Sequence, residues 1–533
     1  MSKHIADLAT KYGPRALTVA SYTRTASHEI ADAAAKAIGA DEPPVDRQHI
    51  GTLHSLCFHA LGRPVIAEKK LRKEWNESAQ YYALTSDGGA DLDNPMDENT
   101  ASSLGDKLFQ QYNVLRSRMV PREMWPESVA GFARLWEDFK YQHDAMDFTD
   151  LIARALRDTD TAPGSPRIGI YDETQDFTLL QLALVRKWAK RMDYILLAGD
   201  DDQCIYFFTG ANPDAFLDPP IDDDHKIILR QSYRVPRSVQ AYAQRWIESN
   251  VRRREPKEYR PRDVEGEVRH LYHATYRHVV PLLADMRQYL EQGKTIMFLA
   301  PCGYMLKPLI ELLRTEGVLF HNPWRTNRGD WNPVRFGGGD GESVSSVERL
   351  LAFLRTEPSV YGEDARLWTG HELYAWLSAL KTDGVLRHGA KKKLKGLADF
   401  HDILPTDEMD ALFTTDGYND VIFNADLDWF EQRLLADKLN GMKFPIHVAR
   451  KHGAKRLMEK PQISLGTIHS VKGGQADVVY LCGDLSTAAL EEWVKVDSDA
   501  HDAIARTMYV GMTRARETLV LVNAVNFSRV ELP

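Results

Sequence analysis

The chain has 533 residues, of which 43% are hydrophobic and 27% charged, and its net charge is −9. This length exceeds what one hydrophobic core usually supports, so we expect about three or four domains. The acidic balance excludes a surface that is basic throughout, so nucleic-acid binding would depend on local patches. The four cysteines form no Cys-x-x-Cys pair, and neither a signal peptide nor an apolar run of about 18 residues is evident. We therefore expect a cytoplasmic protein without a membrane partner.

The chain begins with alternating helix and strand patterns. A helix is predicted over Lys3–Tyr12, and the apolar run Ala16–Ser21 predicts a buried strand. An alanine-rich helix is expected over Thr25–Ile38, with Gly39 ending it. Residues 65–150 hold no comparable strand, and their composition predicts a mostly helical insertion.

The strand pattern resumes at Ile168–Tyr171 and again at Tyr194. A second α/β unit is expected from Lys226, with Ile227–Leu229 as its first strand. Further strands are predicted at Thr295–Ala300, Val478–Leu481 and Thr518–Val522. Near-continuous apolar runs are typical of parallel strands joined by helices. The expected fold class is α/β, with two parallel-sheet cores that each carry a mostly helical insertion. The expected boundaries are 1–64 and 151–222 for the first core, 65–150 for its insertion, 223–325 and 456–533 for the second core, and 326–455 for its insertion.

Polar residues follow two of the first-core strands. Asp172 and Glu173 come just after Ile168–Tyr171, where ligands of open α/β sheets bind. One carboxylate can help to hold Mg²⁺ on a nucleotide, and the other can take a proton from water. Gln203 ends the acidic turn after the next strand, where a neutral amide can report a γ-phosphate. A solvated strand end is the common alternative for such a carboxylate pair.

Two arginines, Arg234 and Arg514, stand at strand ends of the second unit. An arginine supplied by a second domain can neutralise charge that develops during phosphoryl transfer. A surface ion pair is the alternative for either residue taken alone.

Other residues suggest contacts with nucleic acid. Tyr206, Phe207 and Phe208 form an aromatic cluster that either packs in a core or offers a platform for single-strand bases. Thr-x-His occurs once in each core, and hydroxyls and imidazoles suit sequence-independent phosphate contacts. These two motifs end at His54 and His469.

Seven segments together resemble the ordered motifs of superfamily 1 DNA helicases of the UvrD/Rep type. They read ASYTRTASHEI, GTLHSLCFHAL, YDETQD, GDDDQCIYFFTGA, LRQSYRVPRSV, TIHSVKGGQADVVYL and YVGMTRAR. The resemblance implies two RecA-like cores with ATP and Mg²⁺ between them and single-stranded DNA across their tops. It also implies two helical insertions, 3′-to-5′ movement, and action at single/double-strand junctions.

The resemblance also assigns roles to individual residues. For the nucleotide they are Asp172 on Mg²⁺, Glu173 as the base, Gln203 at the γ-phosphate, Tyr233 against adenine, Arg234 and Arg514 as arginine fingers, and Gln475 in place of the family's ribose-contacting acid. For the DNA track they are Tyr22, Thr23, Thr52, His54, Tyr206, Phe208, Thr467 and His469. Phe208 stands where the family usually has tryptophan, and Thr209 where it has arginine.

The family's phosphate loop, GxxGxGK[ST], does not occur in these 533 residues. Lys3–Tyr12 resembles the helix that follows this loop, and Ser2 falls near the loop's last residue, which binds Mg²⁺. Three explanations stay open: a split helicase whose loop lies on a separate N-terminal polypeptide, a truncated enzyme, or an inactive product that still binds DNA. The sequence therefore predicts an ATP-dependent helicase or translocase on single-stranded DNA, or alternatively a single-stranded-DNA-binding protein without catalysis.

Overall fold

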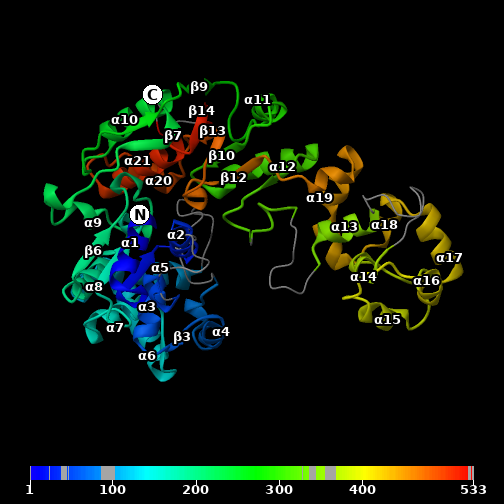
Figure 1. Ribbon diagram of the computed structural model, residues 1–533, viewed down its shortest axis with the longest axis horizontal. Coiled ribbons are helices and arrows are strands. Elements are labelled where there is room, and N and C mark those ends of the chain that lie inside the picture. The colour runs from blue at the N-terminus through cyan, green and yellow to red at the C-terminus, as the bar shows by residue number, and fades with distance from the viewer. Residues whose placement is uncertain are drawn as a thin grey trace.

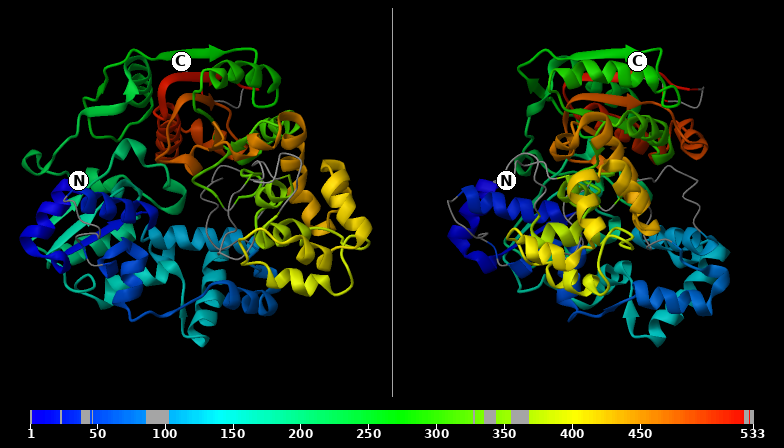
Figure 2. Two further views of the ribbon diagram at one scale, coloured as in Figure 1. Left: turned by 45° about the vertical axis from the view of Figure 1, so that its right-hand side comes forward. Right: turned by 90° about the vertical axis from the view of Figure 1, so that its right-hand side faces the viewer.

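The computed structural model describes residues 2–22, 24–37, 45, 47–85, 103–326, 328–334, 344–354, 368–525 and 530. Its cores are two separate sheets in which every strand pairing is parallel, so the expected α/β class is confirmed. Figures 1 and 2 show the second core stacked above the first. The predicted helix end at Gly39 lies outside the described residues. No helix in the described parts of the chain is long and apolar enough to cross a membrane.

The first core is built on a four-stranded sheet of order β2-β1-β5-β6. Its strands are β1 (Leu17–Ser21), β2 (Ile50–Thr52), β5 (Ile168–Tyr171) and β6 (Tyr194–Leu197). The helices α1 (Ser2–Tyr12), α2 (Arg24–Ala37), α3 (Leu53–Ala60), α7 (Phe148–Asp158) and α8 (Leu179–Ala189) connect and cover them. Strands β1 and β5 are fully buried, as their apolar runs predict. The carboxyl ends of all four strands lie at one edge, where the polar residues that follow them gather.

The second core has a six-stranded sheet of order β11-β12-β10-β13-β14-β9. Its strands are β9 (Glu267–Leu271), β10 (Ile296–Ala300), β11 (Phe320–His321), β12 (Ile463–Thr467), β13 (Ala476–Cys482) and β14 (Ala515–Val522). The helices α10 (Arg237–Asn250) and α21 (Asp499–Met512) share one hydrophobic cluster with residues of β13 and β14. The three later strands predicted for this unit are therefore confirmed.

The predicted strand Ile227–Leu229 is wrong. Ile227 and Leu229 are largely exposed, at 86% and 79%, Ile228 is half-buried, and the strand that follows them is β7 (Gln231–Pro236). It pairs only with β8 (Arg260–Arg262), in a two-stranded sheet outside both cores. An apolar run becomes a strand when a neighbouring strand and a buried face accept it, and the described residues supply neither here.

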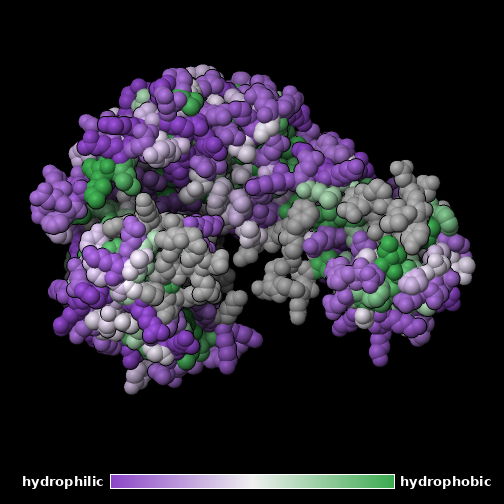
Figure 3. Space-filling model, in the orientation of Figure 1, coloured by the Kyte–Doolittle hydropathy of each residue, from purple (hydrophilic) through white to green (hydrophobic). Residues whose placement is uncertain are grey.

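Each core carries a helical insertion, as expected. The first contains α4 (Lys69–Ser78), α5 (Leu104–Ser117) and α6 (Glu127–Gln142). The second contains α13 (Ser346–Leu354), α14 (Gly370–Leu377), α15 (Ala390–Gly396), α16 (Thr406–Leu412), α17 (Thr415–Asn419), α18 (Leu427–Arg433) and α19 (Ala436–His452). Its helices α14–α18 stand apart from the first core across an open gap in Figure 3, and their visible surface is mostly hydrophilic.

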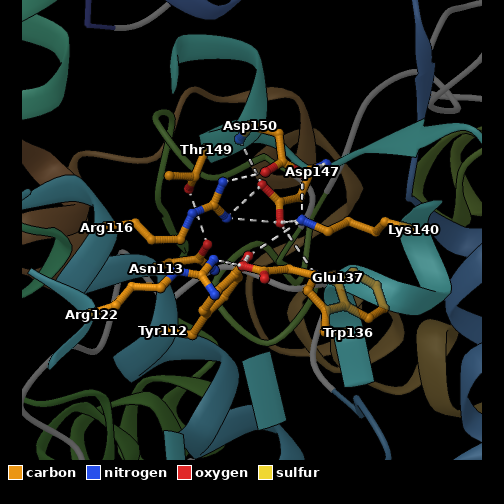
Figure 4. Close-up of polar contacts among 10 residues, drawn as sticks. All are labelled: Tyr112, Asn113, Arg116, Arg122, Trp136, Glu137, Lys140, Asp147, Thr149 and Asp150. Atoms are coloured by element: carbon orange, nitrogen blue, oxygen red, sulfur yellow. Dashed lines mark hydrogen bonds and ion pairs between the residues drawn. The ribbon is translucent and has the colours of Figure 1, made fainter. Parts of the chain in front are cut away.

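Four charged side chains, two of them buried, join the first insertion to α7 (Figure 4). The ammonium of Lys140 lies 2.5 Å from Asp147 and also contacts Asp150. Arg116 pairs with both carboxylates, and the indole N–H of Trp136 donates to Asp147 over 3.2 Å. Burial tends to raise the pKa of Asp147, but the charges of Arg116 and Lys140 outweigh it and hold that pKa below its usual range. The network depends on both cations being present.

We expect Lys140→Met to lower the free energy of unfolding of this region by about 3–5 kcal/mol, because it leaves the buried carboxylate of Asp147 with one of its two cations only. The matched control is Arg122→Met, which removes a cation whose side chain is 58% exposed and paired with Glu137. It should cost less than about 1 kcal/mol. Hydrogen exchange of the α6 amides in native buffer measures both, and equal protection losses would contradict the assignment.

Candidate nucleotide and DNA site

Two carboxylates stand at the carboxyl end of β5. The backbone N–H of Asp172 donates to the carbonyl of Ala20 over 2.8 Å, which places this residue beside the end of β1. Burial, and then the charge of Glu173, raise the pKa of Asp172 to about 6. Glu173 has a φ of 53°, a left-handed conformation that is uncommon outside glycine and often found at functional sites. Its carboxylate accepts a hydrogen bond from the side-chain amide of Gln175 over 2.7 Å.

This carboxylate pair fits Mg²⁺ held together with a nucleotide. Within the described residues, no group of three or more His, Cys, Asp or Glu side chains could hold a metal by itself. Mg²⁺ keeps most of its water and commonly takes one or two carboxylates plus substrate phosphates. The positive charge of Mg²⁺ would also offset the repulsion from Glu173, which contributes to the raised pKa of Asp172.

Gln203 joins the two cores. Its side-chain N–H donates to the carboxylate of Asp200 over 2.8 Å, and its side-chain oxygen accepts from the guanidinium of Arg514 over 3.3 Å. Gln203 follows β6 of the first core, while Arg514 precedes β14 of the second. The structure therefore brings together two residues that lie more than 300 positions apart, while their roles toward a nucleotide stay a prediction.

Two arginines face this junction without an acidic partner. Arg514 is 1% exposed and pairs with no carboxylate among the described residues. Burial, and then the like charge of Arg234, lower the pKa of Arg514 to about 9. In the described structure the buried Nε of Arg234 also has no hydrogen-bond partner. Two neighbouring guanidinium groups in this state favour an anion between them.

A clamp that the sequence did not predict holds Gln203 in place. The ammonium of Lys257 lies 2.7 Å from Asp200, and the hydroxyl of Tyr259 donates to the same carboxylate over 2.9 Å. Lys257 also pairs with Asp201 and Asp202. The segment after α10 thus neutralises the acidic turn and fixes the carboxylate to which Gln203 donates. The sequence hints at this clamp only through the run of basic residues after α10, and such a run does not indicate which carboxylates it pairs with.

Four aromatic side chains form a shelf across both cores, which we call the aromatic shelf: Tyr22, Tyr206, Phe208 and His469. The rings of Tyr22 and Tyr206 stack at 4.9 Å, and Phe208 meets the His469 ring edge-on at 5.6 Å. Burial lowers the pKa of His469 to about 3, so its imidazole is neutral. Tyr206 is buried, as its core-packing alternative requires, whereas Tyr22 and Phe208 are partly exposed. Exposed ring surface is what a stacked base needs.

Three predicted DNA residues make contacts with the local structure, and their role toward DNA stays a prediction. The hydroxyl of Thr52 caps α3 by accepting from the backbone N–H of Ser55 over 3.2 Å. His54 lies edge-on to Phe148 at 5.8 Å, and burial lowers its pKa to about 4. Thr467 is buried, and its hydroxyl accepts from the N–H of Ser470 over 3.2 Å. None of the three belongs to the aromatic shelf.

Two other predicted residues, Tyr233 and Gln475, are not gathered into either cluster. Tyr233 on β7 is 87% exposed, and Gln475 is exposed before β13. Thr23 and the side chain of Ser2 lie outside the described residues. Lys472 lies in the segment TIHSVKGGQADVVYL and was assigned no role from the sequence. It also enters the site, where it pairs with Glu173 and Asp176.

Residues 1–222 match the model of the UvrD/REP helicase N-terminal domain, and residues 228–526 match that of the UvrD-like helicase C-terminal domain. The chain is 22% identical to the protein named "Putative ATP-dependent DNA helicase YjcD" of Bacillus subtilis, over 95% of this chain and 72% of that protein. It is 24% identical to ATP-dependent DNA helicase PcrA of the same organism, over 50% of this chain and 36% of PcrA.

Proposed function

The chain belongs to the UvrD/Rep family of ATP-dependent DNA helicases, and from this premise we propose that it moves 3′-to-5′ along single-stranded DNA and opens duplex at single/double-strand junctions. The observation that carries the proposal is the contact between Gln203 and Arg514, which links the ends of two sheets from different cores. Strand displacement from a duplex with a 3′ tail, compared with a 5′ tail, tests the direction.

The residues of the junction divide the work of phosphoryl transfer. Asp172 would hold Mg²⁺, which supplies positive charge to the β- and γ-phosphates. Glu173 would accept the proton of the attacking water, and Gln203 would contact the γ-phosphate. Arg234 and Arg514 would stabilise the charge that develops on the transferred group. A bound γ-phosphate would separate Gln203 from Arg514, and their contact would form again after hydrolysis, which moves one core against the other.

The phosphate loop would come from a segment outside these 533 residues, on a separate polypeptide or on the same chain, that adds a strand to the first sheet. Support comes from β6, which has a strand neighbour on one side only among the described residues. Its first residue, Tyr194, is 43% exposed and the next three are half-buried, whereas β1 and β5 are buried throughout. Parallel sheets are normally covered and their edges protected, so an open edge favours a missing neighbour.

The Gly-Lys-Thr at residues 293–295 does not supply this loop. It lies between the helix α11 (Val280–Glu291) and β10, whereas a phosphate loop runs from a strand into a helix. Lys294 pairs with Glu517, and the hydroxyl of Thr295 donates to Asp477 over 2.7 Å. Both side chains therefore have acidic partners within the second core, beside the first residue of β10.

A DNA-binding protein without turnover is the second candidate. It is favoured by the same missing loop, since the aromatic shelf is complete without it. The two candidates share the DNA-binding property and differ in ATP hydrolysis, so an assay of phosphate release separates them.

A basic segment in the second insertion is proposed to touch duplex DNA ahead of the motor. It consists of Arg387, Lys391, Lys392, Lys393 and Lys395. The four lysines are exposed on α15, whereas Arg387 donates to the backbone carbonyls of Asp410 and Phe413 over 2.9 and 2.7 Å and so has a structural role. A solvated helix face is the alternative for the lysines.

We expect reversal of Lys391 and Lys392 to glutamate to make the salt dependence of forked-DNA binding shallower, by about 0.9 in slope per lost phosphate contact. Binding to purely single-stranded DNA should not change. Reversal of the half-buried Lys438 and the exposed Lys443 on α19 is the control with the same charge change. Fluorescence anisotropy across a salt series measures the slopes, and equal slopes on both substrates would leave only the solvated-face explanation.

A further inference from the structure

A loop that follows β11 presents an indole ring on the side of the second core that faces the first core. Its described residues, 322–326 and 328–332, form what we call the tryptophan loop, and Figure 1 shows this segment below β12. Trp331 of this loop is 2% exposed, whereas Trp324 is only half-buried. Trp324 is therefore the ring of this loop that keeps a surface open to a ligand.

Two buried asparagines hold the tryptophan loop in its conformation. The side-chain N–H of Asn322 donates to the carbonyl of Leu465 over 2.9 Å, and its side-chain oxygen accepts from the backbone N–H of Trp324 over 3.1 Å. Asn332 accepts from the backbone N–H of Asn322 over 2.9 Å and donates to the carbonyl of Arg325 over 2.8 Å. Buried polar groups that are paired in this way make a segment rigid. The position of Trp324 is therefore set before any ligand arrives.

The ring of Trp324 lies directly against Gly474. A Cβ atom at position 474 would overlap Cζ2 of the indole, so a larger residue there would push the ring away. The N–H of Gly474 donates to the carbonyl of Val471 over 2.8 Å, and Val471 ends the short 3₁₀ helix η12, which begins at His469. The tryptophan loop is thus joined to the helix that carries one ring of the aromatic shelf.

The same ring continues the surface of the aromatic shelf. The rings of Tyr22, Phe208 and Trp324 are all partly buried, and all three pack on the hydrophobic cluster that α10, α21, β13 and β14 share. Each ring keeps some exposed surface. Aromatic rings that follow one another on one surface suit successive bases of a single strand.

Two arginines stand beside this ring. The guanidinium of Arg325 donates to the carbonyl of Trp324 over 2.9 Å. That of Arg328 lies 4.2 Å from the centre of the Trp331 ring and 3.7 Å from Asp330. Stacking rings with cations next to them are typical of proteins that bind single-stranded nucleic acid, because bases stack while phosphates meet the positive charge.

We propose that the tryptophan loop is a further binding site for single-stranded DNA, where one base stacks on Trp324 and a phosphate contacts Arg325. The occupant is the strand that fills the aromatic shelf, so the proposal rests on the proposed function of that shelf. Because Trp324 is joined to η12 through Gly474, a strand that leaves the shelf along the second core reaches the indole next. The loop thereby lengthens the DNA path on this core.

Photo-cross-linking reads the contact directly in the full chain. Oligo(dT) in which thymines are replaced by 5-iodouracil couples on irradiation to aromatic side chains that stack on the base, and mass spectrometry identifies the residue. We expect adducts at Trp324 as well as at Phe208. Trp331 is the internal control, because it belongs to the same loop but is buried, and it should carry no adduct. Adducts at Phe208 with none at Trp324 would overturn the proposal and leave the proposed function intact.

Substitutions separate stacking from packing. Trp324→Leu keeps an apolar side chain against Gly474 but has no flat face, and it should weaken oligo(dT) binding about 5- to 150-fold, the range for one stacked base. Trp324→Phe keeps a flat ring and should keep most of the affinity. Wild-type affinity in Trp324→Leu, or an equal loss in both variants, would assign the indole to packing and overturn the proposal.

The phosphate contact has its own readout. Arg325→Met should reduce the salt slope of oligo(dT) binding by about 0.7, the value for one phosphate contact on a single strand. Arg287→Met, which removes an exposed cation of α11 in the same core, is the matched control and should keep the slope. An unchanged slope in Arg325→Met would overturn the assignment of this arginine. Absence of oligo(dT) binding by the wild-type chain would instead overturn the proposed function.

Discussion

These 533 residues alone are expected to hydrolyse ATP at a small fraction of the rate reached when a loop-bearing N-terminal polypeptide is supplied. The structure assembles the carboxylates, Gln203 and the arginines, but backbone amides of a phosphate loop and its lysine normally hold the β- and γ-phosphates. DNA-stimulated phosphate release, measured with and without that polypeptide, tests this. A full rate from the chain alone would show that the loop is dispensable.

In the restored enzyme, Glu173→Gln should lower turnover by about 10²–10⁴-fold, the usual contribution of a general base. Nucleotide binding should be largely unchanged, because the amide keeps the size of the side chain and removes only its basicity. Glu248→Gln, on the surface of α10, is the matched control and should leave the rate as it is. Comparable turnover in both variants would remove Glu173 from the role of base.

The second large effect is expected at the aromatic shelf. Phe208→Ala should weaken binding of single-stranded DNA by about 1–3 kcal/mol, because one base loses its stacking surface. The loss should be similar for different base sequences, since every base offers a flat face. Anisotropy titration of labelled oligo(dT) and of a mixed-sequence strand, at fixed salt, measures it.

The control for this change is Tyr141→Ala, which removes an aromatic ring that is 87% exposed on α6 of the first insertion. It tests whether any exposed ring contributes. Wild-type affinity in Phe208→Ala would assign Phe208 to packing against His469 alone. A sharp loss in Tyr141→Ala would move the DNA path onto the first insertion.

The sequence by itself was sufficient for the architecture. Buried parallel strands such as β1, β5 and β10 are short apolar runs, so their composition alone distinguishes them from the amphipathic helices around them. The resemblance to the helicase family, and not composition or spacing, assigned Gln203 and Arg514 to one nucleotide, and the structure shows that their side chains are in contact. The strand predicted at Ile227–Leu229 is wrong for a related reason. An apolar run indicates a preference for burial, but it does not indicate whether a partner strand exists.

Only the tertiary structure decided which polar residues share a site. Thr52 and Thr467 look alike in the sequence, yet both hydroxyls satisfy nearby backbone amides, a local competition that spacing does not reveal. Lys472 and Lys257 are the opposite case, since their partners lie in remote segments. A lysine has no preferred partner in a sequence, and its long side chain pairs with whichever carboxylate the packing of the two cores brings within reach.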